Sequence, residues 1–229
     1  MSLPSPTHAN YSSLLTDIER GQVKIPQFQR EFVWTLQKSA ALLDSVIKGY
    51  PVGTFIFWST KDRLRSVREL GNAPLPTPKQ GESVAFVVDG QQRLTSLYAA
   101  IRGITVVRNS GHSDDFSDMF VNLEAGEDDQ IVTTDIDGLE ANTFIRLKDL
   151  LHGSFAELAA LPAQYHSKIS DYRRRIESYD FSIIQVRDVA IDVATELFTR
   201  INVGGKALSV FEILVAKTFD EETGFDLSA

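Results

Sequence analysis

The chain has 229 residues, 43% of them apolar and 24% charged, which predicts a folded globular protein with one large domain or two small ones. It contains no cysteine and no apolar run long enough to span a membrane, which excludes disulfides, thiolate metal sites and a membrane partner and predicts a cytoplasmic protein. The formal net charge of −8 argues against a surface coated in positive potential, so contact with nucleic acid would require a local basic cleft.

Two helices and an extended segment are predicted in the first 50 residues. The first helix spans residues 11–21, because apolar residues recur on one face and a glycine follows them. Residues 23–34 are rich in aromatic side chains, and Pro26 removes a backbone donor and favours an extended conformation, so we expect an extended strap. Thr35 is a typical N-cap for a second helix that reaches about Lys48.

The next stretch alternates strand and helix signals. Residues 52–58 and 64–70 are predicted strands because they are rich in aromatic and β-branched side chains, and a charged turn at 61–63 is expected to join them. Residues 84–88 predict a buried strand, and the apolar positions between Leu94 and Ile101 follow at helical spacing. A strand that passes directly into a helix is therefore expected around residue 90.

The second half predicts a β-rich insert between helical parts. Short strands separated by Asp- and Gly-rich turns suggest a β-meander, with strands at 105–108, 119–123, 130–133 and 144–147. After the insert the pattern predicts a helix, a core strand and two further helices, at 162–179, 181–186, 189–201 and 208–219.

Three polar motifs are candidates for a binding site. The first is the sequence DGQQR at Asp89–Arg93, placed where unpaired N–H groups and the positive end of a helix dipole suit a phosphate. The second is Gln29 with Arg30 in the strap, and the third groups Arg200, Asn202 and Lys206 around two glycines. If the motifs converge, their guanidinium and amide groups describe an anion site. The Asp89 carboxylate could hold Mg²⁺ or orient a water molecule.

Each motif also has a purely structural interpretation. Asp89 and Gln92 have the spacing of a helix capping box, and Arg93 could pair with an acidic neighbour. Gln29 and Arg30 could be surface residues beside core aromatics, and Arg200 and Asn202 could only end a helix. The four histidines are scattered without metal-ligand spacing, which argues against a zinc hydrolase or an HNH nuclease within these residues.

Four motifs occur in an order that resembles the N-terminal domain family of GmrSD-type restriction systems, a family related to the ParB and sulfiredoxin fold. They are IPQFQREFVW at 25–34, YPVG at 50–53 with Trp58, VDGQQR at 88–93, and FTRIN at 198–202 with Gly205 and Leu208. The resemblance implies an α+β fold with a ParB/sulfiredoxin-like core at 1–103. The insert occupies 104–151, and 152–229 completes the same domain with C-terminal helices. We expect the chain to be a fragment that ends before a missing C-terminal nuclease domain, with a separate nuclease subunit as the alternative.

The resemblance implies a domain that binds and hydrolyses a nucleoside triphosphate with Mg²⁺ or another divalent metal, in a phage-defence system that cuts modified DNA. The implied catalytic residues are Asp89, which is also the metal ligand, Gln92 and Arg93. The implied substrate-binding residues are Gln29, Arg30, Gly90, Gln91, Arg200, Asn202 and Lys206. No nuclease centre is expected in this chain, and a homo-oligomer is left open. Two alternatives also remain open, a non-catalytic DNA- or nucleotide-binding module and a plain assembly domain.

Overall fold

A computed structural model describes residues 4–201 of the chain, apart from a few short gaps. The gaps are residues 27, 28, 30, 62–65, 69, 71–74, 77, 80, 109, 127 and 188, and only the backbone is described at 66–68. The predicted helix at 208–219 and the site candidates Arg30, Asn202 and Lys206 therefore lie outside the described residues.

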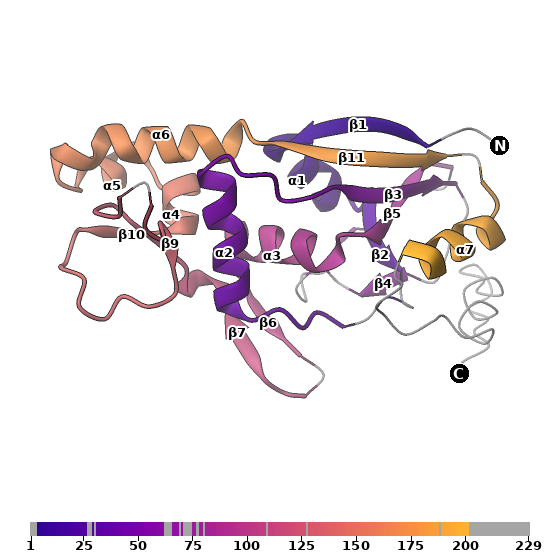
Figure 1. Cartoon of the computed structure of the whole chain (residues 1–229), viewed down its shortest axis with the longest axis horizontal. Helices are drawn as coiled ribbons and strands as arrows, with labels where there is room; N and C mark the ends of the chain where they lie inside the picture. The colour runs from indigo at the N-terminus through magenta and orange to yellow at the C-terminus, as the bar shows by residue number, and fades with distance from the viewer. Residues whose placement is uncertain are drawn as a thin grey trace.

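A six-stranded mixed sheet forms one end of the molecule (Figure 1), and its strand order is β1-β11-β3-β5-β2-β4. β11 pairs in parallel with β3 and antiparallel with β1, while β5 pairs antiparallel with β3 and in parallel with β2. β11, which comes late in the chain, thus lies between the early strands β1 and β3. Both ends of the described chain therefore contribute to one sheet. The strands are β1 (Ser5–Asn10), β2 (Val23–Pro26), β3 (Phe55–Thr60), β4 (Ser66–Arg68), β5 (Val84–Asp89) and β11 (Asp180–Arg187).

The two faces of this sheet bury different helices because side chains alternate along each strand. Phe55, Phe57 and Val87 face the larger core, which also contains apolar side chains of helices α1, α2, α3 and α6. Trp58 and Phe86 face the opposite side, where they pack with α7 in a smaller core. The helices are α1 (Tyr11–Glu19), α2 (Leu36–Ile47), α3 (Gln91–Arg102), α6 (His166–Glu177) and α7 (Ile191–Ile201).

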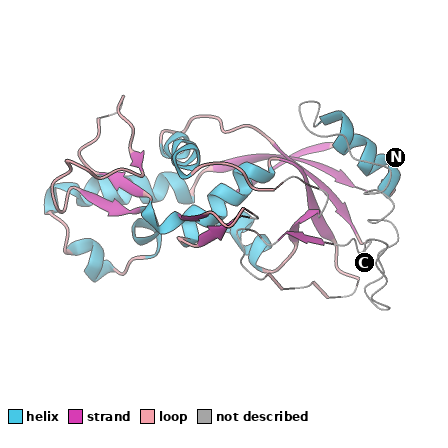
Figure 2. Ribbon diagram, turned by 90° about the horizontal axis from the view of Figure 1, so that it is seen from below, coloured by secondary structure: helices cyan, strands magenta, loops and turns pink. Residues whose placement is uncertain are grey.

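Most of the insert forms a second lobe at the far end from α7, while its first two strands, β6 and β7, project below α2 and α3 in the view of Figure 1 (Figures 1 and 2). The four strands predicted there exist, but β8 lies between β10 and β9, so they do not follow meander order. β6 instead pairs with β7, a strand that was not predicted. The elements of the insert are β6 (Thr105–Val107), β7 (Ser113–Asp115), η1 (Phe116–Asp118), β8 (Phe120–Asn122), β9 (Val132–Thr133), β10 (Phe144–Arg146) and α4 (Leu147–His152), and two short helices follow it, α5 (Phe155–Ala159) and η2 (Ala163–Tyr165).

Two further expectations need correction. The strands predicted at 52–58 and 64–70 exist as β3 and β4, but they are not neighbours in the sheet, because β4 pairs with β2 and two strands separate it from β3. β1 was missed because its side chains are mostly exposed and show no apolar alternation, and its pairing with β11 makes it a strand. The mixed sheet with helices on both faces is consistent with the predicted α+β class, while the ParB/sulfiredoxin relation stays a prediction.

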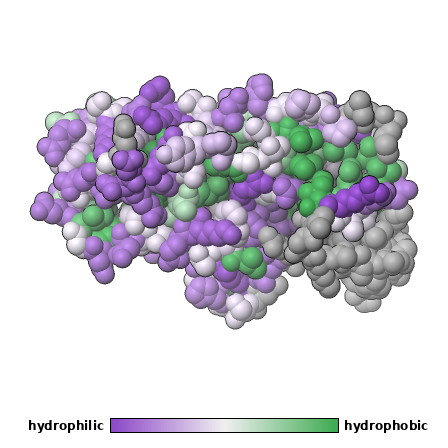
Figure 3. All heavy atoms as spheres, in the orientation of Figure 1, coloured by the Kyte–Doolittle hydropathy of each residue, from purple (hydrophilic) through white to green (hydrophobic). Residues whose placement is uncertain are grey.

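The surface differs between the two ends. In the view of Figure 3, hydrophobic side chains gather over the main sheet beside α7, whereas the insert lobe is mostly hydrophilic. Among the helices that the structure describes, none combines the length and apolar character needed to cross a membrane.

Candidate functional site

A small cavity lies at the N-terminus of α3, directly after β5. Its volume is about 100 Å³, which has room for about three water molecules or one phosphate-sized group, at roughly 30 Å³ per water. The structure therefore brings the second motif, through Gln29, to the DGQQR motif. The lining residues are Gln29, Trp34, Asp89, Gly90, Gln91, Gln92 and Arg93.

The strand-to-helix junction depends on the glycine of the motif. Gly90 is the N-cap of α3 and has a φ of 96°, a left-handed conformation that side-chain-bearing residues rarely adopt. A Cβ there would lie 2.4 Å from Cδ1 of Phe55. No side chain caps this helix, so the capping-box interpretation of Asp89 and Gln92 is wrong. Gly90 itself has no side chain with which to cap the helix.

The Arg93 guanidinium holds the chain segment before β3. Nη1 donates to the Val52 carbonyl at 2.7 Å, and Nη2 donates to the Thr54 carbonyl at 2.9 Å. Nη2 also pairs with Asp89 Oδ2 at 3.1 Å. The residue between the two carbonyls is Gly53, whose Cβ would lie 2.4 Å from Nη1. Three of the five N–H groups of the guanidinium are used in these contacts, so Arg93 fixes the local backbone and balances the charge of Asp89.

Gln92 ties residues 31–34 to α3. These four residues are the part of the predicted strap that lies beside the cavity, and the name strap is kept for them. Its Oε1 accepts hydrogen bonds from the N–H groups of Val33 at 2.8 Å and Trp34 at 3.3 Å, and its Nε2 donates to the Glu31 carbonyl at 3.0 Å. The side chain is buried, so these three contacts are shielded from water. The amide that was expected to act on substrate is thus engaged with backbone.

Gln29 lies two residues before the strap and contacts the end of β5. Its Nε2 donates to the carbonyls of Val87 at 3.1 Å and Val88 at 3.0 Å, the two residues before Asp89. Both glutamines therefore fix the walls of the cavity through backbone contacts. Gln91 is also buried at its edge.

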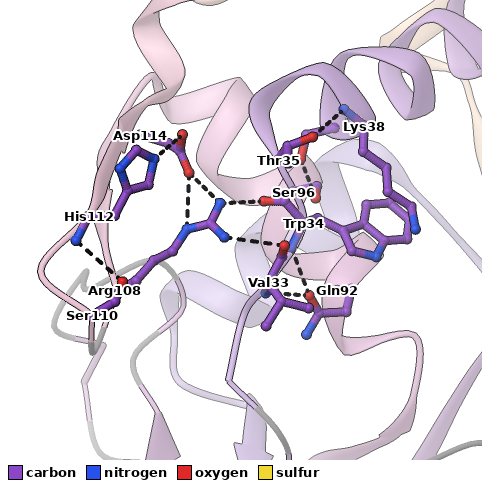
Figure 4. A network of polar contacts seen from close by, with 11 residues as sticks. Val33, Trp34, Thr35, Lys38, Gln92, Ser96, Arg108, Ser110, His112 and Asp114 are labelled. Carbon is purple, nitrogen blue, oxygen red and sulfur yellow. Dashed lines mark hydrogen bonds and ion pairs between the residues drawn. The ribbon is translucent and has the colours of Figure 1, made fainter.

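Trp34 is a wall residue that the sequence reasoning did not single out for the site. Its ring lines the cavity, and Lys38 Nζ lies 4.5 Å from the ring centroid (Figure 4). An exposed cation over an aromatic face contributes about 0.5–1 kcal/mol. The signal that could have identified it is the aromatic residue at the end of the IPQFQREFVW motif.

Asp89 is the accessible carboxylate of the site. Its side chain is 39% exposed, against 17% for Arg93. Within the described part of the chain, no cluster of three or more His, Asp or Glu side chains is close enough to hold a metal ion. The donor set therefore fits a divalent ion only if phosphate and water supply most of its oxygens, which is a common arrangement for Mg²⁺.

Arg200, the described member of the third motif, lies away from this cavity. Arg200 lies on α7, which packs on the opposite face of the main sheet from α3. Its Nη2 pairs with Glu196 Oε1 at 2.6 Å, and its side chain is largely exposed. The structure thus joins two of the three motifs and places the described member of the third elsewhere.

The chain matches a known protein family over most of its length. Residues 11–219 match the model of the GmrSD restriction endonuclease N-terminal domain. Uncharacterized protein MJ0686 of Methanocaldococcus jannaschii is 36% identical over 101 residues, which are 40% of this chain and 17% of that protein. The match thus spans well under two thirds of the length of this relative. Because the family model covers most of the chain, the chain belongs to the family of GmrSD restriction endonuclease N-terminal domains.

Proposed function

We propose that this domain binds and hydrolyses a nucleoside triphosphate and so regulates a phage-defence restriction system that acts on modified DNA. The observation that carries the proposal is the cavity at the start of α3, where Gln29 and the DGQQR motif meet. Membership of a restriction endonuclease family supports the setting.

The size and polarity of the cavity suit a terminal phosphate. The first N–H groups of a helix and the positive end of its dipole attract an anion. With about 100 Å³, the cavity accommodates one phosphate group, and the rest of a nucleotide would lie outside it. The size of the cavity therefore supports a phosphate-bearing substrate.

The negative charge of Asp89 means that a phosphate would bind in this cavity together with a cation. Its carboxylate lines the cavity and would repel a phosphate, and Arg93 offsets this charge through their contact at 3.1 Å. A Mg²⁺ ion held between Asp89 and phosphate oxygens would turn the repulsion into attraction and would supply Lewis-acid stabilisation when bound. Asp89 is also placed to orient an attacking water molecule.

The remaining motif residues would act by holding these groups in place. Arg93 fixes segment 52–54, Gln92 fixes the strap, and Gln29 fixes the end of β5. Gln91 and the backbone of Gly90 lie at the cavity itself. Most of the motif thus preorganises the anion site, and Asp89 performs the chemistry.

Phosphate release with Mg²⁺ tests the proposal. We expect the parent to hydrolyse at least one of the four ribonucleoside triphosphates, Asp89→Asn to lose at least about 100-fold in rate, as removal of a key electrostatic group does, and Arg200→Gln to match the parent. Arg200→Gln is the matched control because it removes an arginine of a family motif away from the cavity. Equal background rates in all three proteins would refute hydrolysis.

The second candidate function is a non-catalytic DNA- or nucleotide-binding module. The distribution of charge along the chain is compatible with DNA binding outside the insert. Residues 104–151 contain eleven acidic and three basic residues, a formal charge of −8, so the rest of the chain is balanced. The net charge that argues against DNA binding is therefore located in the insert. Duplex DNA affinity that falls steeply with salt, without phosphate release, would select this candidate.

A further inference from the structure

The β6–β7 hairpin reaches back from the insert to the strap (Figure 4). Arg108, at the end of β6, donates from Nη1 to the Val33 carbonyl at 3.2 Å and from Nη2 to the Trp34 carbonyl at 2.8 Å. These are long-range contacts between parts of the chain more than 70 residues apart. No motif of the sequence pointed to Arg108.

The strap is therefore held from two sides. Gln92 accepts hydrogen bonds from the N–H groups of Val33 and Trp34, and Arg108 donates hydrogen bonds to the carbonyls of the same two residues. Trp34 also lines the cavity at the start of α3. Fixing both the N–H and the carbonyl of a residue leaves little freedom for its backbone, so Arg108 and Gln92 together set the position of this wall.

Asp114 on β7 locks Arg108 in place. Its Oδ2 accepts hydrogen bonds from Nε at 3.1 Å and from Nη2, and both side chains are largely shielded from solvent. The Arg108 guanidinium also lies 5.9 Å from the ring of Phe32, which packs on Phe116 with centroids 6.0 Å apart. This ion pair resists rearrangement, because separating its partners would leave a charge that is shielded from water and has no counter-charge.

We propose that Arg108, oriented by Asp114, is a positioning residue for the candidate site: it sets the Trp34 wall and thereby determines how tightly a phosphate-bearing ligand is held. The inference rests on the proposed function for its ligand. The placement of Trp34 by Arg108 is a separate claim that can be tested without any ligand.

The native tryptophans provide the ligand-free test. The chain has two, Trp34 and Trp58, and Trp58 is buried on the opposite face of the sheet, so Trp58→Phe leaves Trp34 as the single reporter. In that background we expect Arg108→Gln to increase acrylamide quenching of Trp34 at least about twofold, and Arg108→Lys, which keeps a cation, to restore part of the protection. Quenching of Arg108→Gln equal to that of the background protein would overturn the proposal.

A second arginine of the insert is the matched control. Arg146 pairs with Asp118 at 3.9 Å and is half-exposed, and its guanidinium lies over Phe120 away from the strap. Arg146→Gln removes the same charge from the same lobe, so it should leave Trp34 quenching unchanged. If it changes quenching as much as Arg108→Gln does, the effect belongs to the lobe as a whole and the proposal fails.

Nucleotide hydrolysis then separates positioning from simple support of the fold. We expect Arg108→Gln to raise KM with kcat nearly unchanged, because a displaced Trp34 wall weakens binding of the ground state and of the transition state alike. Increased quenching with an unchanged KM would show that Trp34 moved without affecting the ligand, which would overturn the positioning role. Absence of hydrolysis and nucleotide binding in the parent would instead refute the proposed function, and the quenching comparison would still decide whether Arg108 places Trp34.

Discussion

Replacing Gln92 with alanine tests how much its hydrogen bonds to the strap contribute to the free energy of unfolding. The substitution removes three hydrogen bonds to main-chain groups, at 2.8, 3.0 and 3.3 Å. At about 1 kcal/mol for each net hydrogen bond, the loss is about 3 kcal/mol in the free energy of unfolding. For a chain of this size, each kcal/mol lowers Tm by roughly 2–4 °C, so a decrease of about 6–12 °C is expected.

Thermal melting and urea titration of the parent and two comparison variants measure this effect. Gln92→Glu keeps an acceptor for the N–H groups of the strap, but it buries a charged carboxylate and turns one of its oxygens towards the Glu31 carbonyl, so it should cost well over about 1 kcal/mol. Gln130→Ala removes an amide that makes one local hydrogen bond to Val132 at 2.7 Å on an exposed part of the chain, so it should cost less than about 1 kcal/mol.

The opposite pattern would refute the structural role of Gln92. If Gln92→Ala melts at the same temperature as Gln130→Ala but no longer binds nucleotide, its amide serves the ligand rather than the strap. The catalytic role implied by the family resemblance would then be the better explanation.

Three further substitutions test other parts of the site and the fold. Arg93→Lys should lower the free energy of unfolding by about 1.5–3 kcal/mol in urea titration, because lysine cannot hold both carbonyls of segment 52–54; an unchanged midpoint would contradict this. Gly90→Ala should destabilise by more than about 1 kcal/mol, since its Cβ would clash with Phe55 at a positive φ, and a parent-like Tm would show that the junction is less constrained. Burial raises the pKa of Asp17, so its charged form destabilises the fold increasingly as pH rises above about 3.9. Asp17→Asn should therefore raise Tm at pH 7, with a gain that shrinks towards pH 4, and a gain independent of pH would refute this cause.

The sequence predicted the elements whose signals are local. Helices α1 and α2 follow from apolar spacing, and Thr35 caps α2 as predicted, while Asn10, which was not predicted as a cap, caps α1. The four short strands of the insert were found because turn residues separate them. By contrast, β1 is a strand only because β11 pairs with it, and the partner of β4 is decided by contacts between distant segments.

The same distinction applies to the site. Gln29 lies beside the DGQQR motif because it contacts the end of the buried strand β5, whereas Arg200 lies on the other face of the sheet. That these residues form a binding site stays a prediction. The bonding of Arg93 to two carbonyls and of Gln92 to the strap depends on chain segments about 40 and 60 residues away, which periodicity does not reveal. Arg108 carried no local signal at all, since its importance comes from the position of the hairpin beside the strap.

Isothermal titration with non-hydrolysable analogues of the four ribonucleoside triphosphates in Mg²⁺ tests the phosphate site most directly. We expect the parent to bind at least one analogue, Asp89→Asn to bind it at least about tenfold more weakly, a difference of about 1.4 kcal/mol, and Arg200→Gln to bind it like the parent. Equal affinity of the parent and Asp89→Asn, or the absence of binding in the parent at millimolar analogue, would contradict a phosphate site at the start of α3.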